Sequence, residues 1–386
     1  MRRRRFVFGI AAGAAGLALD PERLAALSAA AHSPSDQISA PVARTVRVKL
    51  YSGQKLIRAD VSGAGADGTP VIFSFDANTT FKPTAIGGGV PLTVTAYDAD
   101  GLIASRRYAG SLLVAPDASS ISIVNTVDSE AYTASVLGAE MGPAWPVESL
   151  KAQAVAIRTY ALHAAVRSKK AYDLGDDTSS QVYRGMDAVS DRFTTAAHDT
   201  AGLVLFDGDA VAEVFYSAAC GGHTASSAEL TGGAARGYLR GIADLNAGGA
   251  AYCAKAPYFS WQNVIPSGAL ERIFDLDAGD LAAIDASETW PEGRVKRLKA
   301  RSRHGFENVI DGREFYGRCG SLLGYKVVPS TMFRVEPDAE GYRFTGHGIG
   351  HGIGMCQWGA RGRADAGMST AAILAAYFPG TTPRQA

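Results

Sequence analysis

The chain has 386 residues, of which 47% are hydrophobic and 20% are charged, and this balance is ordinary for a soluble globular protein with a substantial core. Basic and acidic residues both number 38, so the formal net charge is zero. Without a basic excess, the composition argues against a nucleic-acid partner. A chain of this length is expected to fold as two or three structural units.

The N-terminal segment carries an export pattern. Four arginines at 2–5 precede a modest apolar run over 6–19, which is typical of a signal peptide and resembles a twin-arginine signal. We expect the signal to cover 1–31 and a linker to follow over 32–41. The alternative is an uncleaved membrane anchor, for which the run is short. The sequence therefore predicts export to the cell envelope, the periplasm or the exterior, with no membrane span left after cleavage.

Two stretches with different patterns follow the linker. Apolar and polar residues alternate with period two at 46–50 and 92–97, which predicts a small antiparallel β unit over 42–115. The remainder, 116–382, mixes strand and helix patterns, with one helical stretch expected over 270–286. We therefore expect an α+β fold, rich in strands, in which a central helix stands beside a groove.

Glu140 lies at the end of the first of two predicted helices. The first runs over 129–141 and ends at a Gly-Pro-Ala-Trp-Pro turn, and the second begins at Pro146 and continues to about Val166. A carboxyl held near Trp145 in such a turn is partly removed from water, which raises its pKa and makes it usable as a general acid near neutral pH. The alternative is a solvated glutamate at a helix end.

A glycine-rich loop near the C-terminus reads Gly-His-Gly-Ile-Gly-His-Gly-Ile-Gly over 346–354. Alternating glycines let the backbone come close to a ligand, and His347 and His351 project from the loop. Two histidines four residues apart could bind a metal on a helix, but so much glycine disfavours a helix. The alternative is a tight structural loop whose histidines bond to backbone.

Four cysteines are too few for a disulfide scaffold. Cys220 and His223 flank two glycines, and with Cys253 they could supply three ligands to one Zn²⁺. The alternatives are a disulfide between the two cysteines of an exported protein and a pair of buried free thiols.

A polar string over 178–183 offers hydrogen-bonding groups and an aromatic face that suit sugar hydroxyls, although polar loops of this kind are common.

Several of these segments occur together in one known family. In order along the chain, and over roughly 108–382, the sequence resembles the SpoIID/LytB family, named after stage II sporulation protein D. The matching blocks are Glu140-Met141 with Trp145 to Leu162, Thr178 to Tyr183, Cys220 to Thr224, Tyr252-Cys253, Gly346 to Ala360, and Tyr377 to Thr381. Two departures are the block 129–133, before the glutamate, and Cys356, where many relatives have serine.

The resemblance implies a peptidoglycan lytic transglycosylase whose catalytic domain spans 116–382. Such enzymes cleave the β-1,4 bond between N-acetylmuramic acid and N-acetylglucosamine of glycan strands and leave a 1,6-anhydro end. The family's catalytic glutamate corresponds to Glu140, which would act alone as general acid and then as base. No cofactor is required, although some members are associated with zinc, and glycans stripped of their stem peptides are expected substrates.

A set of side chains is expected to position the glycan strand around the glutamate: Lys151, Arg158, Tyr160, Ser180, Gln181, Tyr183, His347, His351 and Gln357. For the first three, a structural role that ties the helix to neighbouring loops is equally open. Two other functions stay as alternatives. One is a non-catalytic wall-binding protein that stimulates a separate amidase, and the other is a zinc hydrolase built on Cys220, His223, Cys253 or the histidine loop.

Overall fold

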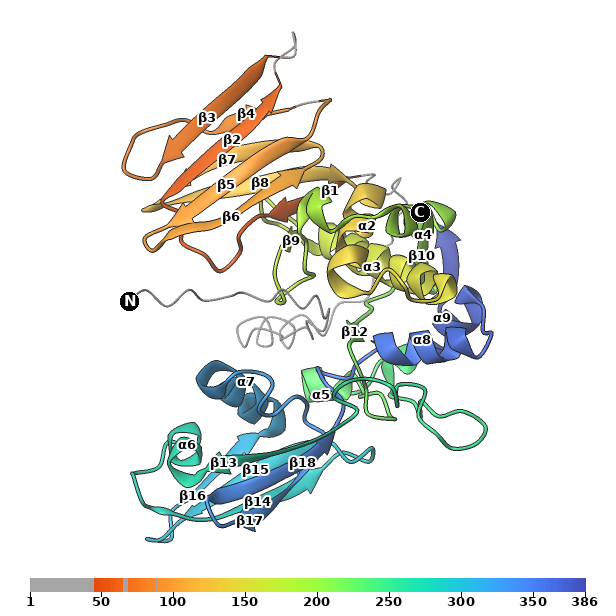
Figure 1. Ribbon diagram of the computed structural model, residues 1–386. Coiled ribbons are helices and arrows are strands. Elements are labelled where there is room, and N and C mark those ends of the chain that lie inside the picture. Colours follow the sequence, from red (N-terminus) through yellow and green to blue (C-terminus); the bar gives the residue numbers. More distant parts are fainter. Residues whose placement is uncertain (1–44, 65–68, 88) are drawn as a thin grey trace, which may run out of the picture.

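The computed structural model describes residues 45–386 apart from 65–68 and 88 (Figure 1). The signal peptide expected over 1–31 and the linker expected over 32–41 lie outside the described residues. Within the described part of the chain, no helix combines the length and the apolar character needed to cross a membrane.

The N-terminal part of the described chain forms two β-sheets. The four-stranded sheet is antiparallel in the order β3-β2-β5-β6, built from β2 (Arg58–Ala64), β3 (Pro70–Asp76), β5 (Leu92–Asp98) and β6 (Gly101–Tyr108). The five-stranded sheet has the order β4-β7-β8-β1-β9, built from β1 (Thr45–Lys49), β4 (Thr84–Ile86), β7 (Ser111–Asp117), β8 (Ser120–Asp128) and β9 (Leu174–Gly175). Leu92, Val94 and Ala96 are buried and alternate with less buried residues along β5, as the period-two pattern predicts.

The two helices expected around Glu140 are present. The first, α2 (Ser129–Glu140), begins where the Asp128 carboxylate accepts hydrogen bonds from two backbone N–H groups of the first turn. The second, α3 (Val147–Arg167), begins directly after Pro146. Leu150, Ala154 and Ile157 recur at helical spacing along α3 and are buried, and α4 (Asp191–Asp199) packs against both helices. The two helices therefore place Glu140 at a turn inside the core.

The β unit expected over 42–115 is continuous with the rest of the fold. The expected boundary falls inside β7, and β7 pairs along its whole length with β8. The first strand, β1, pairs antiparallel with β8 and parallel with β9, which lies beyond α3 in the chain. One hydrophobic core runs from Val46 to Phe378. These pairings join residues far apart in the chain, and local alternation of apolar residues does not encode them.

A second hydrophobic core occupies the segment 260–347, the lower part of Figure 1. Phe315, Phe333 and Phe344 lie at its centre, with ring centroids 5.3 to 5.8 Å apart. Its elements are β13 (Ser260–Pro266), α6 (Ser267–Ile273), β14 (Leu281–Thr289), β15 (Val295–Ser302), β16 (Glu307–Asp311), α7 (Gly312–Leu323), β17 (Phe333–Asp338) and β18 (Gly341–His347). They form the three-stranded sheets β13-β18-β17 and β14-β15-β16.

The helix expected over 270–286 is only partly present. It is correct as far as the end of α6, but Leu281 to Thr289 forms strand β14, which pairs with β15. A short run with this apolar spacing fits either structure, and here pairing with a neighbouring strand decides the outcome.

Shorter elements complete the described part of the chain. They are η1 (Gly185–Ala188), β10 (Leu203–Asp207), β11 (Ala210–Val211), β12 (Tyr216–Ser217), α5 (Ala228–Thr231), η2 (Gly237–Leu239), β19 (Met355–Cys356), α8 (Gln357–Asp365), α9 (Thr370–Tyr377) and β20 (Thr382–Gln385). Strand β12 pairs in parallel with β19, which brings the segment before Cys220 beside the end of the glycine-rich loop. The fold is α+β and rich in strands, as predicted.

Candidate active site

Glu140, the last residue of α2, is only 2% exposed. Burial raises the pKa of its carboxyl to about 7, while a hydrogen bond from Gln357, the Val182 backbone and the charge of Arg184 offset this in part. The Gln357 amide donates to Oε2 over 3.3 Å, and Oε1 has no hydrogen-bond partner among the described residues. Near neutral pH this carboxyl is therefore partly protonated and able to donate its proton.

Two tryptophans hold α8, and with it Gln357, against the turn that follows Glu140. The rings of Trp145 and Trp358 pack edge to face with centroids 5.0 Å apart. The guanidinium of Arg361 lies over both rings, at 5.3 and 4.8 Å. Because Gln357 is the first residue of α8, this packing places its amide at the carboxyl. The expected contact of Gln357 with the glycan strand stays a prediction.

A buried polar chain runs beside Glu140. The Tyr132 hydroxyl donates to Gln181 Oε1 over 2.9 Å, and Gln181 Nε2 donates to the Tyr216 hydroxyl over 2.8 Å. Burial raises the pKa of both tyrosines, and the charge of Glu140 raises it further. Gln181, predicted as a sugar contact, is fully buried and has protein partners at both ends of its amide.

The other predicted sugar contacts of the 178–183 string are also engaged with the protein. Ser180 Oγ accepts a hydrogen bond from the Gly175 backbone over 3.2 Å. The hydroxyl of Tyr183 donates to Asn125 Oδ1 over 2.8 Å, and both side chains are buried. These contacts bind the string to strands β8 and β9. Ser180 and Tyr183 therefore act in this structure as packing and hydrogen-bonding residues of the protein interior.

The two histidines of the glycine-rich loop have different surroundings. His351 is buried; its Nδ1 accepts from the Ile353 backbone over 3.1 Å, so Nε2 carries the proton and donates to the Tyr216 carbonyl over 2.9 Å. Burial lowers the pKa of His351 to about 3, so the ring is neutral. His347 is exposed, with Nδ1 3.2 Å from both Ser260 Oγ and the Phe259 carbonyl. The two rings therefore have separate partners.

The alternating glycines of this loop serve close contact within the chain. Gly348, Gly352 and Gly354 all have positive φ, near 75°. A Cβ at these positions would lie 2.5 Å from the Ala219 carbonyl oxygen, 2.2 Å from an Arg294 nitrogen and 2.0 Å from the Phe215 carbonyl oxygen, respectively. The loop can therefore lie directly against the segment that leads to Cys220.

The three α3 residues predicted around Glu140 have contacts that favour the structural alternative. Lys151 pairs with Asp199 over 2.8 Å, which joins α3 to α4. Arg158 is buried, pairs with Glu130 and also donates to the carbonyls of Leu203 and Ala197 over 3.0 and 3.1 Å. The ring of Tyr160 packs against Phe215, with centroids 6.3 Å apart.

A cavity of about 1540 Å³ lies between the two hydrophobic cores. The 177–179 turn, α5 and His351 form one side, and α7 with Trp290 forms the other. Glu140 does not line it. Of the five acids that do, the buried one is Glu229, a residue the sequence reasoning missed; burial raises its pKa to about 8 and its Oε1 has no partner among the described residues. Two buried acids are therefore candidates for the site: Glu229, which lines the cavity, and Glu140, which does not.

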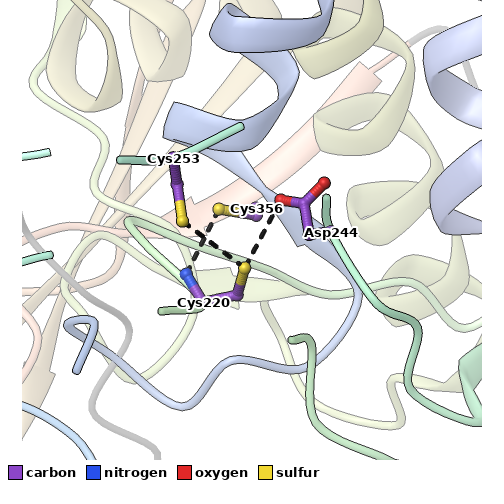
Figure 2. A group of neighbouring side chains, drawn as sticks. All are labelled: Cys220, Asp244, Cys253 and Cys356. Atoms are coloured by element: carbon purple, nitrogen blue, oxygen red, sulfur yellow. Dashed lines mark hydrogen bonds between the residues drawn. The ribbon is translucent and has the colours of Figure 1, made fainter. Parts of the chain in front are cut away.

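Three cysteines and one aspartate meet in a buried cluster, drawn in Figure 2. We call Cys220, Asp244, Cys253 and Cys356 the thiol cluster; their ligand atoms all lie within 4.8 Å of one another. Cys220 Sγ is 3.7 Å from Cys253 Sγ and 3.4 Å from Asp244 Oδ2. All four cysteines of the described chain are free thiols, and burial raises the pKa of Cys220 and Cys356.

His223, predicted as a third ligand beside Cys220 and Cys253, lies outside the thiol cluster. Its Nδ1 is 2.8 Å from the Thr224 carbonyl oxygen, and its backbone pairs with Ala243. The two glycines before it, Gly221 and Gly222, both have positive φ and turn the chain away. Cys356 and Asp244, which the spacing did not suggest, take the places beside the two predicted cysteines.

Comparison with known proteins identifies the family. The family model for the stage II sporulation protein, SpoIID, matches residues 117–206. An uncharacterized protein of Brachyspira hyodysenteriae is 34% identical over 280 residues, which cover 71% of each chain. The chain belongs to the SpoIID/LytB family. Stage II sporulation protein D of Bacillus subtilis is 24% identical over 67% of this chain and 75% of its own, and the amidase enhancer of Bacillus subtilis is 28% identical over 64% of this chain and 39% of its own.

The part matched by the SpoIID model coincides with one side of the site. It runs from the end of β7 through α2 and α3 to β10, and it contains Glu140 and the buried polar chain partner Gln181. Gln357, Glu229 and the thiol cluster lie beyond it. The SpoIID segment thus supplies the acid at the helix end, and the rest of the chain supplies the groups that cover it.

Proposed function

We propose that the protein is a peptidoglycan lytic transglycosylase that cuts glycan strands between N-acetylmuramic acid and N-acetylglucosamine, with Glu140 as its single acid and base. Membership of the SpoIID/LytB family, and relatives named for sporulation and for amidase enhancement, support a cell-wall-related role. The observation that carries the finer proposal is a carboxyl held out of water, with a pKa of about 7 and one oxygen free of hydrogen bonds among the described residues.

The chemistry needs one carboxyl that changes its protonation state. Protonated Glu140 donates to the leaving glycosidic oxygen while positive charge develops on the sugar ring. Ionised Glu140 then takes the proton of the sugar's own C6 hydroxyl, whose oxygen closes the 1,6-anhydro ring. The proton returns to the carboxyl, and no water is consumed.

The surroundings of Glu140 fit a reaction with one acid better than hydrolysis with two. Glycosidases that use water place a second carboxyl about 5 to 9.5 Å from the first. The groups that act on the pKa of Glu140 are Gln357, the Val182 backbone and Arg184, none of which is a carboxylate. A nucleophile inside the substrate removes the need for a second acid.

The glycan strand is proposed to lie in the cavity between the two cores. Of the residues expected to contact it, His351 lines the cavity, beside Thr178 and Ser179, and His347 is exposed. His351 donates to the Tyr216 carbonyl, and Tyr216 lies beside Glu140. Because Glu140 itself does not line the cavity, the proposed reaction requires the chain around His351 and Tyr216 to move when the strand binds.

A second candidate function is a wall-binding protein that stimulates an amidase without cutting glycan. Two observations favour it: Glu140 does not line the cavity, and one relative is named amidase enhancer. A hydrolase with catalytic zinc has less support. A catalytic zinc site keeps one position open for water, whereas the thiol cluster is buried on all sides.

The products of purified peptidoglycan separate these functions. Mass spectrometry should find 1,6-anhydro ends after incubation with the wild-type protein, on intact wall or on glycan stripped of stem peptides, and none with Glu140→Gln. Glu229→Gln is the matched control, a second buried acid, and should still release anhydro products. Reducing ends would mean hydrolysis, and wall binding without products from either glycan would mean the amidase-stimulating role. Loss of products with Glu229→Gln, but not with Glu140→Gln, would mean that Glu229 at the cavity wall is the proton donor.

A further inference from the structure

The thiol cluster is assembled from three distant parts of the chain. Cys220 follows β12, Asp244 and Cys253 lie on the irregular segment after η2, and Cys356 ends β19 just before α8 (Figure 2). All four side chains are buried, with exposures of 0%. Burying three thiols and a carboxylate together costs free energy unless something compensates their polarity.

Two of the distances in the cluster match the edges of a tetrahedral metal site, and all four ligand atoms lie within 4.8 Å of one another. With zinc–sulfur bonds of about 2.3 Å, two sulfur ligands of a tetrahedron lie about 3.8 Å apart, and a sulfur and a carboxylate oxygen lie about 3.5 Å apart. Cys220 Sγ is 3.7 Å from Cys253 Sγ and 3.4 Å from Asp244 Oδ2. The chain thus holds these donors at the spacing of ligands to one metal ion, and the two sulfurs are too far apart to be covalently bonded.

The number of thiols also points to a metal. A disulfide would use two of the three cysteines and leave the third as a buried thiol. Cys356 Sγ instead accepts hydrogen bonds from the backbone N–H groups of Cys220 and Gly359, each over 3.2 Å. The Cys356 sulfur thus acts as an acceptor at the start of α8, with its lone pairs turned toward polar donors, and the same lone pairs are the ones that a metal ion would take.

The surroundings orient the carboxylate and balance the charge. Arg363 donates to Asp244 Oδ1 over 2.9 and 3.1 Å, and the Tyr377 hydroxyl lies 2.9 Å from both carboxylate oxygens. Oδ2 is the oxygen that also faces Cys220. Arg294, fully buried, donates to the Cys220 carbonyl over 3.0 Å. Four anionic ligands, one divalent ion and two guanidinium groups sum to zero charge. Partners of this kind fix ligands in known metal sites.

We propose that Cys220, Asp244, Cys253 and Cys356 bind one zinc ion in a closed, structural site. Soft thiolate donors in tetrahedral spacing select zinc among the common divalent ions. The site braces three segments, and Cys356 directly precedes Gln357, whose amide contacts Glu140. The metal is therefore a positioning device for α8, and the proposal holds whether or not the protein cuts glycan.

The test is the metal content of the full chain, purified without reducing agents and passed through metal-free buffer. Elemental analysis should find one zinc per chain. Cys220→Ser, Cys253→Ser and Cys356→Ser should each lose it, with native folds checked by circular dichroism. Two matched controls should keep it: Cys319→Ser, a buried free thiol of the second core, and His223→Ala, the neighbour that lies outside the cluster.

Mass spectrometry of the wild-type protein keeps the proposal open to refutation even if the variants do not fold. The native mass should exceed the denatured mass by one zinc ion less the protons it displaces, and a thiol-blocking mercurial should release zinc to a coloured chelator. A metal-free chain two hydrogens lighter than the fully reduced one would establish a disulfide and overturn the proposal. So would a metal-free chain with free thiols that takes up no added zinc, or zinc retained by Cys356→Ser.

Discussion

The burial of Glu140 has a measurable consequence for stability. Its carboxyl has a pKa of about 7 in the folded chain, against an ordinary value of 4.5. The raised value means that the folded state favours the protonated form. This contribution to stability is fully present below the ordinary pKa and is lost as the pH rises through the folded value. Glu140→Gln removes the titration and keeps a neutral side chain of similar shape.

The size of the effect follows from the two pKa values. At about 1.36 kcal/mol for each pH unit, the interval from 4.5 to about 7 corresponds to about 3 kcal/mol of unfolding free energy. The wild-type protein loses this amount between acidic and mildly alkaline pH, whereas Glu140→Gln does not. We therefore expect the variant to gain about 3 kcal/mol relative to wild type over that range.

Urea unfolding, followed by tryptophan fluorescence at a series of pH values, measures the difference. Glu148→Gln is a matched control with the opposite sign. Hydrogen bonds from Thr370 hold the pKa of Glu148 below its ordinary value, so its contribution is present at neutral pH and disappears as the pH falls through the folded value. A free-energy difference between Glu140→Gln and wild type that stays constant from acidic to alkaline pH would refute the burial argument.

Two further predictions concern the neighbours of Glu140. Gln357→Leu removes the donor that lowers the pKa of Glu140, so the alkaline fall of the glycan-cleavage rate should move to higher pH; an unchanged pH profile would contradict this. Arg158→Met leaves Glu130 and two carbonyls without their buried partner and should cost about 3 to 5 kcal/mol in urea unfolding, while Lys151→Met, with the half-exposed partner Asp199, should cost less than about 1 kcal/mol. If Lys151→Met abolished glycan cleavage at unchanged stability, Lys151 would instead contact the substrate.

The features that sequence predicted well are local. The alternation of buried residues along β5 and the start of α3 directly after Pro146 follow from patterns within a few residues. The family blocks also identified Glu140 and Gln357 as members of one site, because the blocks extend along the whole chain and no single segment contains both residues. The structure joins these two side chains by a hydrogen bond across 217 residues of sequence separation.

The features that sequence missed depend on distant pairing. Cys356 lies beside Cys220 because β12 pairs with β19, and Asp244 because its backbone N–H bonds to the Gly222 carbonyl. Neither contact follows from the spacing of the residues in the sequence. The second core likewise depends on strands β13 and β18, which are far apart in the chain. The polar string around Gln181 looks solvent-facing by composition, but its partners Tyr132 and Tyr216 bury it.

The protonation state of Glu140 is the point on which the proposed reaction depends, and it can be followed directly. In protein labelled with carbon-13 at the glutamate carboxyls, the resonance that is missing from Glu140→Gln belongs to this side chain. We expect it to titrate with a midpoint near pH 7, as its burial demands. A midpoint near the ordinary value of 4.5 would show a solvated, ionised carboxylate at neutral pH, which cannot serve as the proton donor.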